Sequence, residues 1–221
     1  MTLIRVLLVD DDPLVCAGLR LLLSSAPDLQ VVGEVHDGDE VVAATAAHRP
    51  HVVLMDLRMA RVNGVEATRA VRALPDPPQV IALTTWDVDD ALVRTLAAGA
   101  SGYLLKSAEP MAIIEAVRTV VRGEAVLSPK STRQLLDHLD QGDPSAARHE
   151  AARAMNSLTE REREVVIRMA EGLTNAAIGA SLYLSEATVK THLSAAQTKL
   201  GVRNRVELAV LAERAGLLPV S

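Results

Sequence analysis

The sequence predicts an α/β domain with a doubly wound parallel sheet, followed by a small all-helical domain. Two observations lead to this prediction. Over roughly the first 120 residues, short apolar runs alternate five times with segments of helical period, the pattern of a flavodoxin-like (βα)5 fold. After residue 158 the apolar residues recur at helical spacing throughout, with capping residues between the runs.

Five runs are predicted to be strands, because they are short, mostly apolar and bounded by turn residues. They cover residues 4–9, 29–35, 51–56, 77–85 and 102–106. Their nearly continuous apolar character is expected of a parallel sheet that is covered by helices on both faces.

Five helices are expected to follow these strands, at residues 13–26, 37–50, 62–74, 88–100 and 107–123. Pro13 opens the first of them. Asp12 could serve as an additional acidic group, but the preference of Asp for helix caps favours a structural role. Cys16 is predicted to be a small core residue of the same helix.

The second half of the chain is expected to divide into a linker and a further domain. Residues 1–124 form the α/β domain, residues 125–153 read as a linker with partial helix, and residues 154–221 form the helical domain. Thr159 and Glu162 have the spacing of a capping box. Thr174 and Ser185 are predicted to cap the next two helices.

Composition excludes several classes of protein. The chain has 221 residues, of which 49% are hydrophobic and 23% charged, as in globular proteins with real cores. A single cysteine excludes an internal disulfide and a cysteine-based zinc site. No apolar run approaches a membrane span, and the start lacks a signal-peptide pattern, so we expect a cytoplasmic protein. Acids outnumber bases up to residue 154, whereas the remainder is slightly basic, which suggests different partners for the two domains.

Carboxylates, a hydroxyl and a lysine stand at the ends of four predicted strands. Asp10 and Asp11 follow the first strand, Asp56 ends the third, Thr84 the fourth and Lys106 the fifth. These ends meet at one edge of a parallel sheet. A single Asp there is often a turn or cap residue, but a cluster of like charges is costly and has no obvious structural use. Such a cluster suits Mg²⁺, beside which a carboxylate can accept a phosphoryl group while a lysine and a hydroxyl stabilise its oxygens.

The segments VLLVDDDPLV, VVLMDLRM, ALTTWD and GYLLK resemble, in order, the receiver domain of two-component response regulators, between residue 4 and about residue 122. The resemblance implies that Asp56 is the phosphoacceptor and that Thr84 and Lys106 bind the phosphoryl group. It implies that Tyr103 is a switch that turns inward as Thr84 moves toward the phosphate. The implied Mg²⁺ ligands are the carboxylates of Asp11 and Asp56, Asp10 mainly through water, and the backbone carbonyl of Arg58.

The sequence departs from the receiver pattern in the loop after Asp56. Ala60 stands where the family commonly has Pro, and Arg61 and Asn63 stand where it commonly has Gly and Asp. This loop is therefore expected to be less rigid than in the family, with an effect on the lifetime of the phosphoryl group.

LTEREREVV and the run GLTNAAIGASLYLSEATVKTHLSAAQTKLGVRNRVELAVLA are similar to the LuxR/NarL-type helix-turn-helix DNA-binding domain over about 60 residues. The resemblance implies a recognition helix from Glu186 to Leu200 and a last helix that forms a dimer on a two-fold operator. Val189 and Leu193 are predicted to be core. The family often has Glu-Ile-Ala at residues 177–179, so helix packing or operator choice is expected to differ here. The predicted DNA contacts are Lys190, Thr191 and Ser194 to bases or phosphates, and His192, Lys199, Arg203 and Arg205 to phosphates.

These features together predict a transcription regulator that is controlled by phosphorylation. The expected partners are a sensor histidine kinase, double-stranded operator DNA, a second copy of the chain and RNA polymerase. A phosphotransferase that turns over is an alternative, but such hydrolases place a second Asp two residues after the nucleophile, where this chain has Arg58. A constitutive DNA binder is another alternative, against which the complete set of receiver residues argues.

The fluorescence of Trp86, close to Thr84, is expected to respond to Mg²⁺ or an acyl phosphate.

Overall fold

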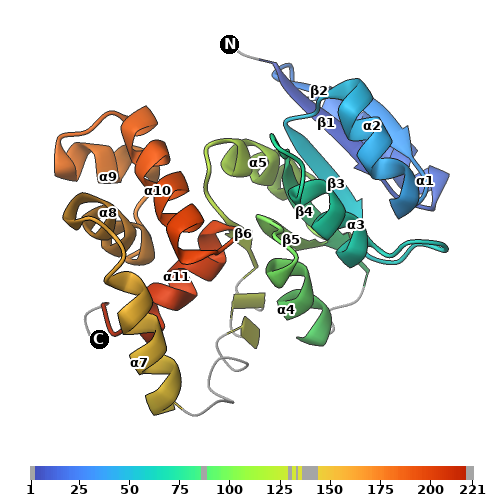
Figure 1. The fold of residues 1–221 in the computed structure, drawn as a ribbon. Coiled ribbons are helices and arrows are strands. Elements are labelled where there is room, and N and C mark those ends of the chain that lie inside the picture. The colour runs from blue at the N-terminus through green and yellow to red at the C-terminus, as the bar shows by residue number, and fades with distance from the viewer. Residues whose placement is uncertain (1–2, 86–88, 129–130, 133, 136–143, 218–221) are drawn as a thin grey trace. The chain divides into compact units, whose positions relative to one another are not determined.

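The computed structural model describes residues 3–85, 89–128, 131–132, 134–135 and 144–217 (Figure 1). The chain divides into two compact units, Met1–Leu135 and Leu136–Ser221. Trp86, proposed above as a fluorescent reporter, lies outside the described residues. In the part of the chain that is described, no helix combines the length and the apolar character that crossing a membrane requires.

The first unit is built on a parallel sheet with the strand order β2-β1-β3-β4-β5-β6. The five predicted strands are all present, and they occupy the flavodoxin-like order that the alternating pattern indicated. A sixth strand, which the sequence did not reveal, pairs with β5. The bounds are β1 Ile4–Val9, β2 Leu29–Val35, β3 Val52–Asp56, β4 Gln79–Thr84, β5 Gly102–Leu105 and β6 Val126–Leu127.

Helices follow the strands as predicted. Asp12 caps α1, because its carboxylate accepts the backbone N–H of Leu14 at 2.9 Å, and this confirms its structural role. Asn63 caps α3 in the same way and accepts two backbone N–H groups at 3.1 Å. The second predicted helix begins as a short 3-10 turn, Gly38–Glu40, before α2. The helices are α1 Pro13–Ser24, α2 Val41–His48, α3 Gly64–Arg72, α4 Asp89–Ala97 and α5 Pro110–Val121.

Two apolar cores lie on opposite faces of the sheet. One joins alternate strand residues to α1 and α5, and Cys16, only 1% exposed, belongs to it as predicted. The other joins the intervening strand residues to α2 and α3. Every residue of β3 is buried, because both faces of this central strand are covered. The phosphoacceptor candidate Asp56 is the last residue of that strand.

Within residues 144–217, the described part of the second unit, all regular structure is helical. Its core holds Val165, Ile178, Val189 and Leu193, together with Met155 from α7. Residues 144–153, the last part of the predicted linker with partial helix, belong to the continuous helix α7, Pro144–Met155, which packs against α11. The helices are α7 Pro144–Met155, α8 Glu160–Ala170, α9 Asn175–Leu182, α10 Glu186–Leu200 and α11 Arg205–Arg214.

The predicted helix caps of this unit are confirmed. Thr159 and Glu162 form a reciprocal capping box at the start of α8. Thr174 caps α9 and Ser185 caps α10, each through a side-chain oxygen that accepts a backbone N–H. Gly201 ends α10 in the left-handed conformation that glycine adopts without strain.

Candidate functional site

Three carboxylates converge where β1 and β3 end. The register pairs Val9 with Met55, which brings the next residues, Asp10 and Asp56, to the same level of the sheet. One carboxylate oxygen from each of Asp10, Asp11 and Asp56 lies within 4.8 Å of the others. Asp10 and Asp56 are buried, whereas Asp11 is exposed. The site is therefore buried on the side of Asp10 and Asp56 and open to solvent at Asp11.

Lys106 is the cation of this site. Its Nζ lies 2.5 Å from Oδ2 of Asp10 and 3.1 Å from Oδ1 of Asp56. Burial raises the pKa of Asp56, although the nearby charge of Lys106 opposes that rise. Burial alone would lower the pKa of Lys106, but its hydrogen bond to Asp10 and the charges of Asp56 and Asp10 raise it overall. Lys106 is therefore charged at neutral pH and partly offsets the repulsion between the buried carboxylates.

Thr84 stands beside this cluster, at the end of β4. Asp56 pairs with Leu83, so Thr84 lies one residue beyond the level of Asp56 on the neighbouring strand. Its carbonyl accepts the backbone N–H of Lys106 at 2.7 Å, and this bond connects the ends of β4 and β5. The sheet thus gathers carboxylates, a hydroxyl and an ammonium group at one edge.

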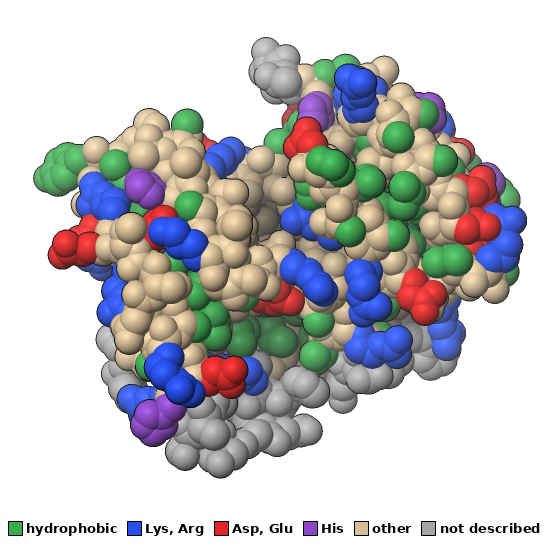
Figure 2. All heavy atoms as spheres, viewed as in Figure 1, with side chains coloured by type: hydrophobic (Ala, Val, Ile, Leu, Met, Phe, Trp, Pro, Cys, Tyr) green, Lys and Arg blue, Asp and Glu red, His purple; other side chains and the backbone are tan. Residues whose placement is uncertain are grey.

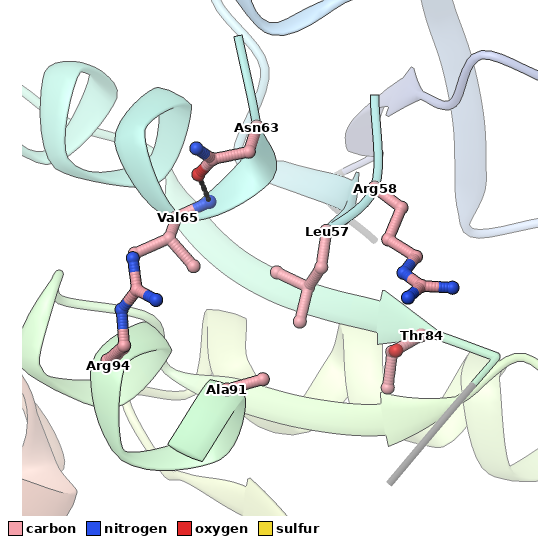
Figure 3. Close-up of a pocket in the computed structure, with 7 residues that line it drawn as sticks. All are labelled: Leu57, Arg58, Asn63, Val65, Thr84, Ala91 and Arg94. Carbon is pink, nitrogen blue, oxygen red and sulfur yellow. Dashed lines mark hydrogen bonds between the residues drawn. The ribbon is translucent and has the colours of Figure 1, made fainter. Parts of the chain in front are cut away.

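A pocket of about 220 Å³ opens next to Thr84 (Figure 3). Figure 3 shows Arg58, from the loop after β3, and Arg94, from α4, at opposite ends of this pocket. Its lining is completed by Leu57, Asn63, Val65 and Ala91. The space beside Thr84 is consequently flanked by two guanidinium side chains, which favour negative charge there.

Tyr103 is fully buried in β5. It pairs with Ala82 on β4 and with Leu127 on β6, so it lies between these two strands. The resemblance to receiver domains implies an aromatic side chain that turns inward here, and the structure places Tyr103 inside.

The loop after β3 is held by residues that the sequence did not single out. Asp37 accepts the backbone N–H groups of Arg61 and Val62, each at 2.8 Å. Burial would raise the pKa of Asp37, but these backbone hydrogen bonds and the charge of Arg61 lower it overall. The Arg61 guanidinium lies 2.9 Å from both Asp39 and Glu40. The loop expected to be less rigid is thus fastened to the turn after β2.

The same loop is closed tightly at its other end. A Cβ on Gly64 would lie 2.0 Å from the carbonyl oxygen of Asp56, so only glycine fits there. The available signal for the Asp37 contact was weak, because Asp37 stands two residues after the end of β2 and nothing in the sequence pairs it with Arg61.

The three carboxylates fit a hard divalent cation. They are oxygen donors within reach of one ion, and an open side leaves room for the waters that Mg²⁺ retains. Among the described residues, this is the one group of three or more His, Cys, Asp or Glu side chains with that spacing.

The predicted DNA contacts in the second unit fall into two groups. Lys190, Thr191 and Ser194 are exposed along one side of α10, and Arg203 is exposed after it. His192 is half-buried. Figure 2 shows Lys, Arg and His side chains on the outer surface of this unit, interspersed with acidic and hydrophobic ones.

Lys199 is also exposed and Arg205 is half-buried, and both bond to other helices of the unit. The Lys199 ammonium donates to both carboxylate oxygens of Glu162, at 2.9 and 2.7 Å. Arg205 donates to Oδ1 of Asn175 at 2.7 Å and to the carbonyl of Leu173 at 2.6 Å. These two cations tie α10 and α11 to the start of α8 and α9. Val189 and Leu193 are buried, as predicted.

Comparison with known proteins agrees with both units. The family model "Response regulator receiver domain" matches residues 6–118, and "Bacterial regulatory proteins, luxR family" matches residues 156–212. Transcriptional regulatory protein LiaR of Bacillus subtilis (strain 168) is 40% identical over 213 residues, which are 96% of this chain and 98% of LiaR. Nitrate/nitrite response regulator protein NarL of Escherichia coli (strain K12) is 35% identical over 205 residues, 93% of each chain.

A solved structure extends the likeness to the whole chain. The crystal structure of response regulator ChrA, from a heme-sensing two-component system, has a TM-score of 0.54 and 36% sequence identity, and the match covers 99% of this chain and 100% of that one. The chain therefore belongs to the two-component response regulators in which a receiver domain precedes a LuxR-type helix-turn-helix DNA-binding domain.

Proposed function

We propose that a sensor histidine kinase transfers a phosphoryl group to Asp56 and that this modification controls dimerisation and sequence-specific DNA binding, and thereby transcription. The observation that carries the proposal is the position of Asp56. Its carboxylate is buried beside Asp10 and Asp11, and the Nζ of Lys106 lies 3.1 Å from it. Such an arrangement suits an acceptor that is used once per signal and read out as a charge.

In the transfer step, a carboxylate oxygen of Asp56 attacks phosphorus, and the P–N bond of the kinase phosphohistidine breaks. The electron pair of that bond returns to the imidazole nitrogen. Lys106 and the Thr84 hydroxyl stabilise two of the phosphoryl oxygens as the charge shifts. Asp10, Asp11, Asp56 and the backbone carbonyl of Arg58 would hold Mg²⁺, which supplies neutralising charge at the phosphoryl group when bound.

The readout begins with Thr84. A phosphoryl group on Asp56 attracts the Thr84 hydroxyl. Tyr103, on the next strand, turns inward as Thr84 moves toward the phosphate. This biases a two-state equilibrium of the receiver surface around α4 and β5. The active state dimerises through the receiver and through α11, so that two copies of α10 engage a two-fold operator.

On DNA, α10 lies in the major groove. Lys190, Thr191 and Ser194 reach base edges or phosphates, and His192 and Arg203 contact phosphates. Lys199 and Arg205 act by fixing the positions of the helices, because their cationic groups are bonded to Glu162 and Asn175. The bound dimer acts on RNA polymerase at promoters in the cytoplasm.

The protein is a regulator and not a phosphatase that turns over. An aspartate-based hydrolase needs an acid/base group next to the nucleophile to hydrolyse its intermediate. Arg58 stands two residues after Asp56, where such hydrolases place a second Asp, and it carries no carboxyl group. The aspartyl phosphate therefore persists as a signal.

The test is covalent modification of the full chain by an acyl phosphate with Mg²⁺. Intact mass measurement is expected to show one added phosphoryl group, and peptide mapping is expected to place it on Asp56. Asp56→Asn is expected to remain unmodified and to stay monomeric in sedimentation runs. Modification at another residue, or none in the presence of Mg²⁺, would reject the proposed site.

A further inference from the structure

The turn between α9 and α10 contains a residue that the stability of the fold does not explain. Tyr183 has φ 55° and ψ 43°, in the left-handed region that bulky side chains rarely adopt. It is 97% exposed, so its ring gains almost nothing from burial within this chain. Glycine would adopt the same conformation without cost. Tyrosine at this position therefore lowers stability.

The backbone of the turn cannot move to relieve this strain. The N–H groups of Tyr183 and Leu184 both donate to the carbonyl of Gly179, the latter at 2.8 Å. The turn is pressed against α9, because a Cβ on Gly179 would lie 2.7 Å from the Leu184 carbonyl oxygen. Ser185 then caps α10 by accepting the N–H of Thr188 at 3.1 Å. The Tyr183 side chain thus projects into solvent from a fixed point, two residues before that cap.

Strained residues of this kind cluster at functional sites. The position of Tyr183 identifies the function. It precedes the helix whose outer side carries Lys190, Thr191 and Ser194. When such a helix enters the major groove, its N-terminal residues contact base edges and helix N-termini are among the groups that bond to phosphates, so a residue just before the helix can reach the DNA backbone. A tyrosine hydroxyl is one of the side-chain donors that bind phosphate oxygens.

We propose that Tyr183 is a DNA-contacting residue, whose hydroxyl donates a hydrogen bond to a phosphate of the operator backbone at the N-terminal end of α10. The inference rests on the proposed function, because it requires α10 to be the recognition helix. A neutral donor of this kind strengthens binding to every sequence alike and displaces no counterion.

The test uses the full-length chain, an acyl phosphate with Mg²⁺, and a duplex obtained by in vitro selection with the wild-type protein. Tyr183→Phe keeps the ring and the strain and loses only the hydroxyl. It is expected to raise Kd by about fivefold, the effect of one net hydrogen bond, and to leave Tm unchanged. The slope of log Kd against log salt is expected to stay that of the wild type.

Tyr183→Gly separates an effect on DNA contact from an effect on folding, because it is expected to weaken DNA binding while it stabilises the second unit. Its Kd is expected to rise at least as much as that of Tyr183→Phe, while the Tm of the second unit rises by about 2–4 °C as the strain is relieved. Arg49→Gly is the matched control, because Arg49 is an exposed residue of the first unit with φ 43°. It is expected to leave Kd unchanged.

A Kd of Tyr183→Phe equal to that of the wild type would overturn the inference. So would weaker DNA binding by Tyr183→Gly together with a lower Tm, because loss of stability would then explain the loss of binding. Either result, with normal binding by the wild type, leaves the proposed function intact. A selection from which the wild type recovers no duplex would contradict both.

Discussion

The Nζ of Lys106 lies 3.1 Å from Oδ1 of Asp56, and this ion pair links the ends of β5 and β3 within a mostly buried site. The same ammonium group contacts Asp10 at 2.5 Å. One cation therefore balances two buried carboxylates.

Lys106→Met is expected to destabilise the receiver unit by about 2–4 kcal/mol without Mg²⁺, because it leaves Asp10 and Asp56 buried without a counter-charge. Mg²⁺ binds those carboxylates and is expected to raise the Tm of Lys106→Met more than that of the wild type. Thermal unfolding with EDTA and with Mg²⁺ measures the difference. Lys190→Met, an exposed lysine of the second unit, is the control. An equal response to Mg²⁺ in both variants would refute this role of Lys106.

Thr84→Ala is expected to separate modification from output. Asp56 should still accept a phosphoryl group from an acyl phosphate, because its carboxylate and Lys106 are unchanged. The gain in dimerisation should fall by at least tenfold, since no hydroxyl is drawn toward the phosphate, which corresponds to about 1.4 kcal/mol of coupling. Thr84→Ser retains the hydroxyl and should behave more like the wild type in sedimentation experiments. If phosphorylated Thr84→Ala dimerises as strongly as the phosphorylated wild type, Thr84 does not transmit the effect of phosphorylation to dimerisation.

Asp37→Ala is expected to weaken Mg²⁺ binding, although Asp37 is not a proposed ligand. The loop that carries Arg58 loses two hydrogen bonds, those from the backbone N–H groups of Arg61 and Val62. Asp37→Asn keeps one acceptor oxygen and should be affected less. Mg²⁺ titration followed by NMR of the Asp56 region gives Kd for each variant. The idea fails if both variants bind Mg²⁺ as the wild type does.

The contact between Glu162 and Lys199 predicts a dependence of stability on pH. Hydrogen bonds from Lys199 and from the backbone N–H of Thr159 lower the pKa of Glu162 to about 2. A carboxyl whose pKa is lower in the folded state stabilises the fold above its unfolded pKa, near 4.5, and loses that contribution as pH falls toward 2. The free energy of unfolding of the second unit, measured with urea, should therefore fall more steeply between pH 6 and pH 3 in the wild type than in Glu162→Gln. Glu164→Gln removes the same charge from a more exposed position, where Glu164 pairs with Arg161, and serves as the control.

Lys190 and Arg205, both expected from the sequence to contact DNA, should give opposite phenotypes. Lys190→Ala is expected to weaken DNA binding and to reduce the salt slope by about 1, as the loss of one phosphate contact does. Arg205→Ala is expected instead to lower the stability of the second unit by about 1–3 kcal/mol, because the carbonyl of Leu173 and the amide oxygen of Asn175 lose their donor. A wild-type Tm for Arg205→Ala, together with a smaller slope of log Kd against log salt, would show that Arg205 contacts DNA and does not hold the helices together.

Much of the fold could be predicted because its signals are local. Continuous apolar runs mark β1 to β5, and the caps at Asp12, Thr159, Thr174 and Ser185 mark helix starts to within a residue. Strand β6 was missed because two residues show no period and pair only through the edge of β5. Helix α7 was expected to be a linker with partial helix because its sequence is polar and rich in alanine. Among its side chains of described burial only Ala151 and Met155 are buried, and only tertiary packing reveals this.

The candidate site was predicted unevenly for the same reason. Asp10, Asp56, Thr84 and Lys106 come together because strand ends of one parallel sheet must meet. The contacts of Asp37 with the loop after β3, and of Arg205 with Asn175, join segments 24 and 30 residues apart through side chains. No spacing in the sequence marks such pairs, since charged residues of this kind serve equally well on a solvated surface.

The most direct test of the central claim is the affinity of the full-length chain for its selected duplex, measured with and without an acyl phosphate and Mg²⁺, in the wild type and in Asp56→Asn. The account predicts that the phosphodonor tightens binding by the wild type at least tenfold and leaves Asp56→Asn unchanged. Equal tightening in both proteins, or none in either, would contradict control of DNA binding through Asp56.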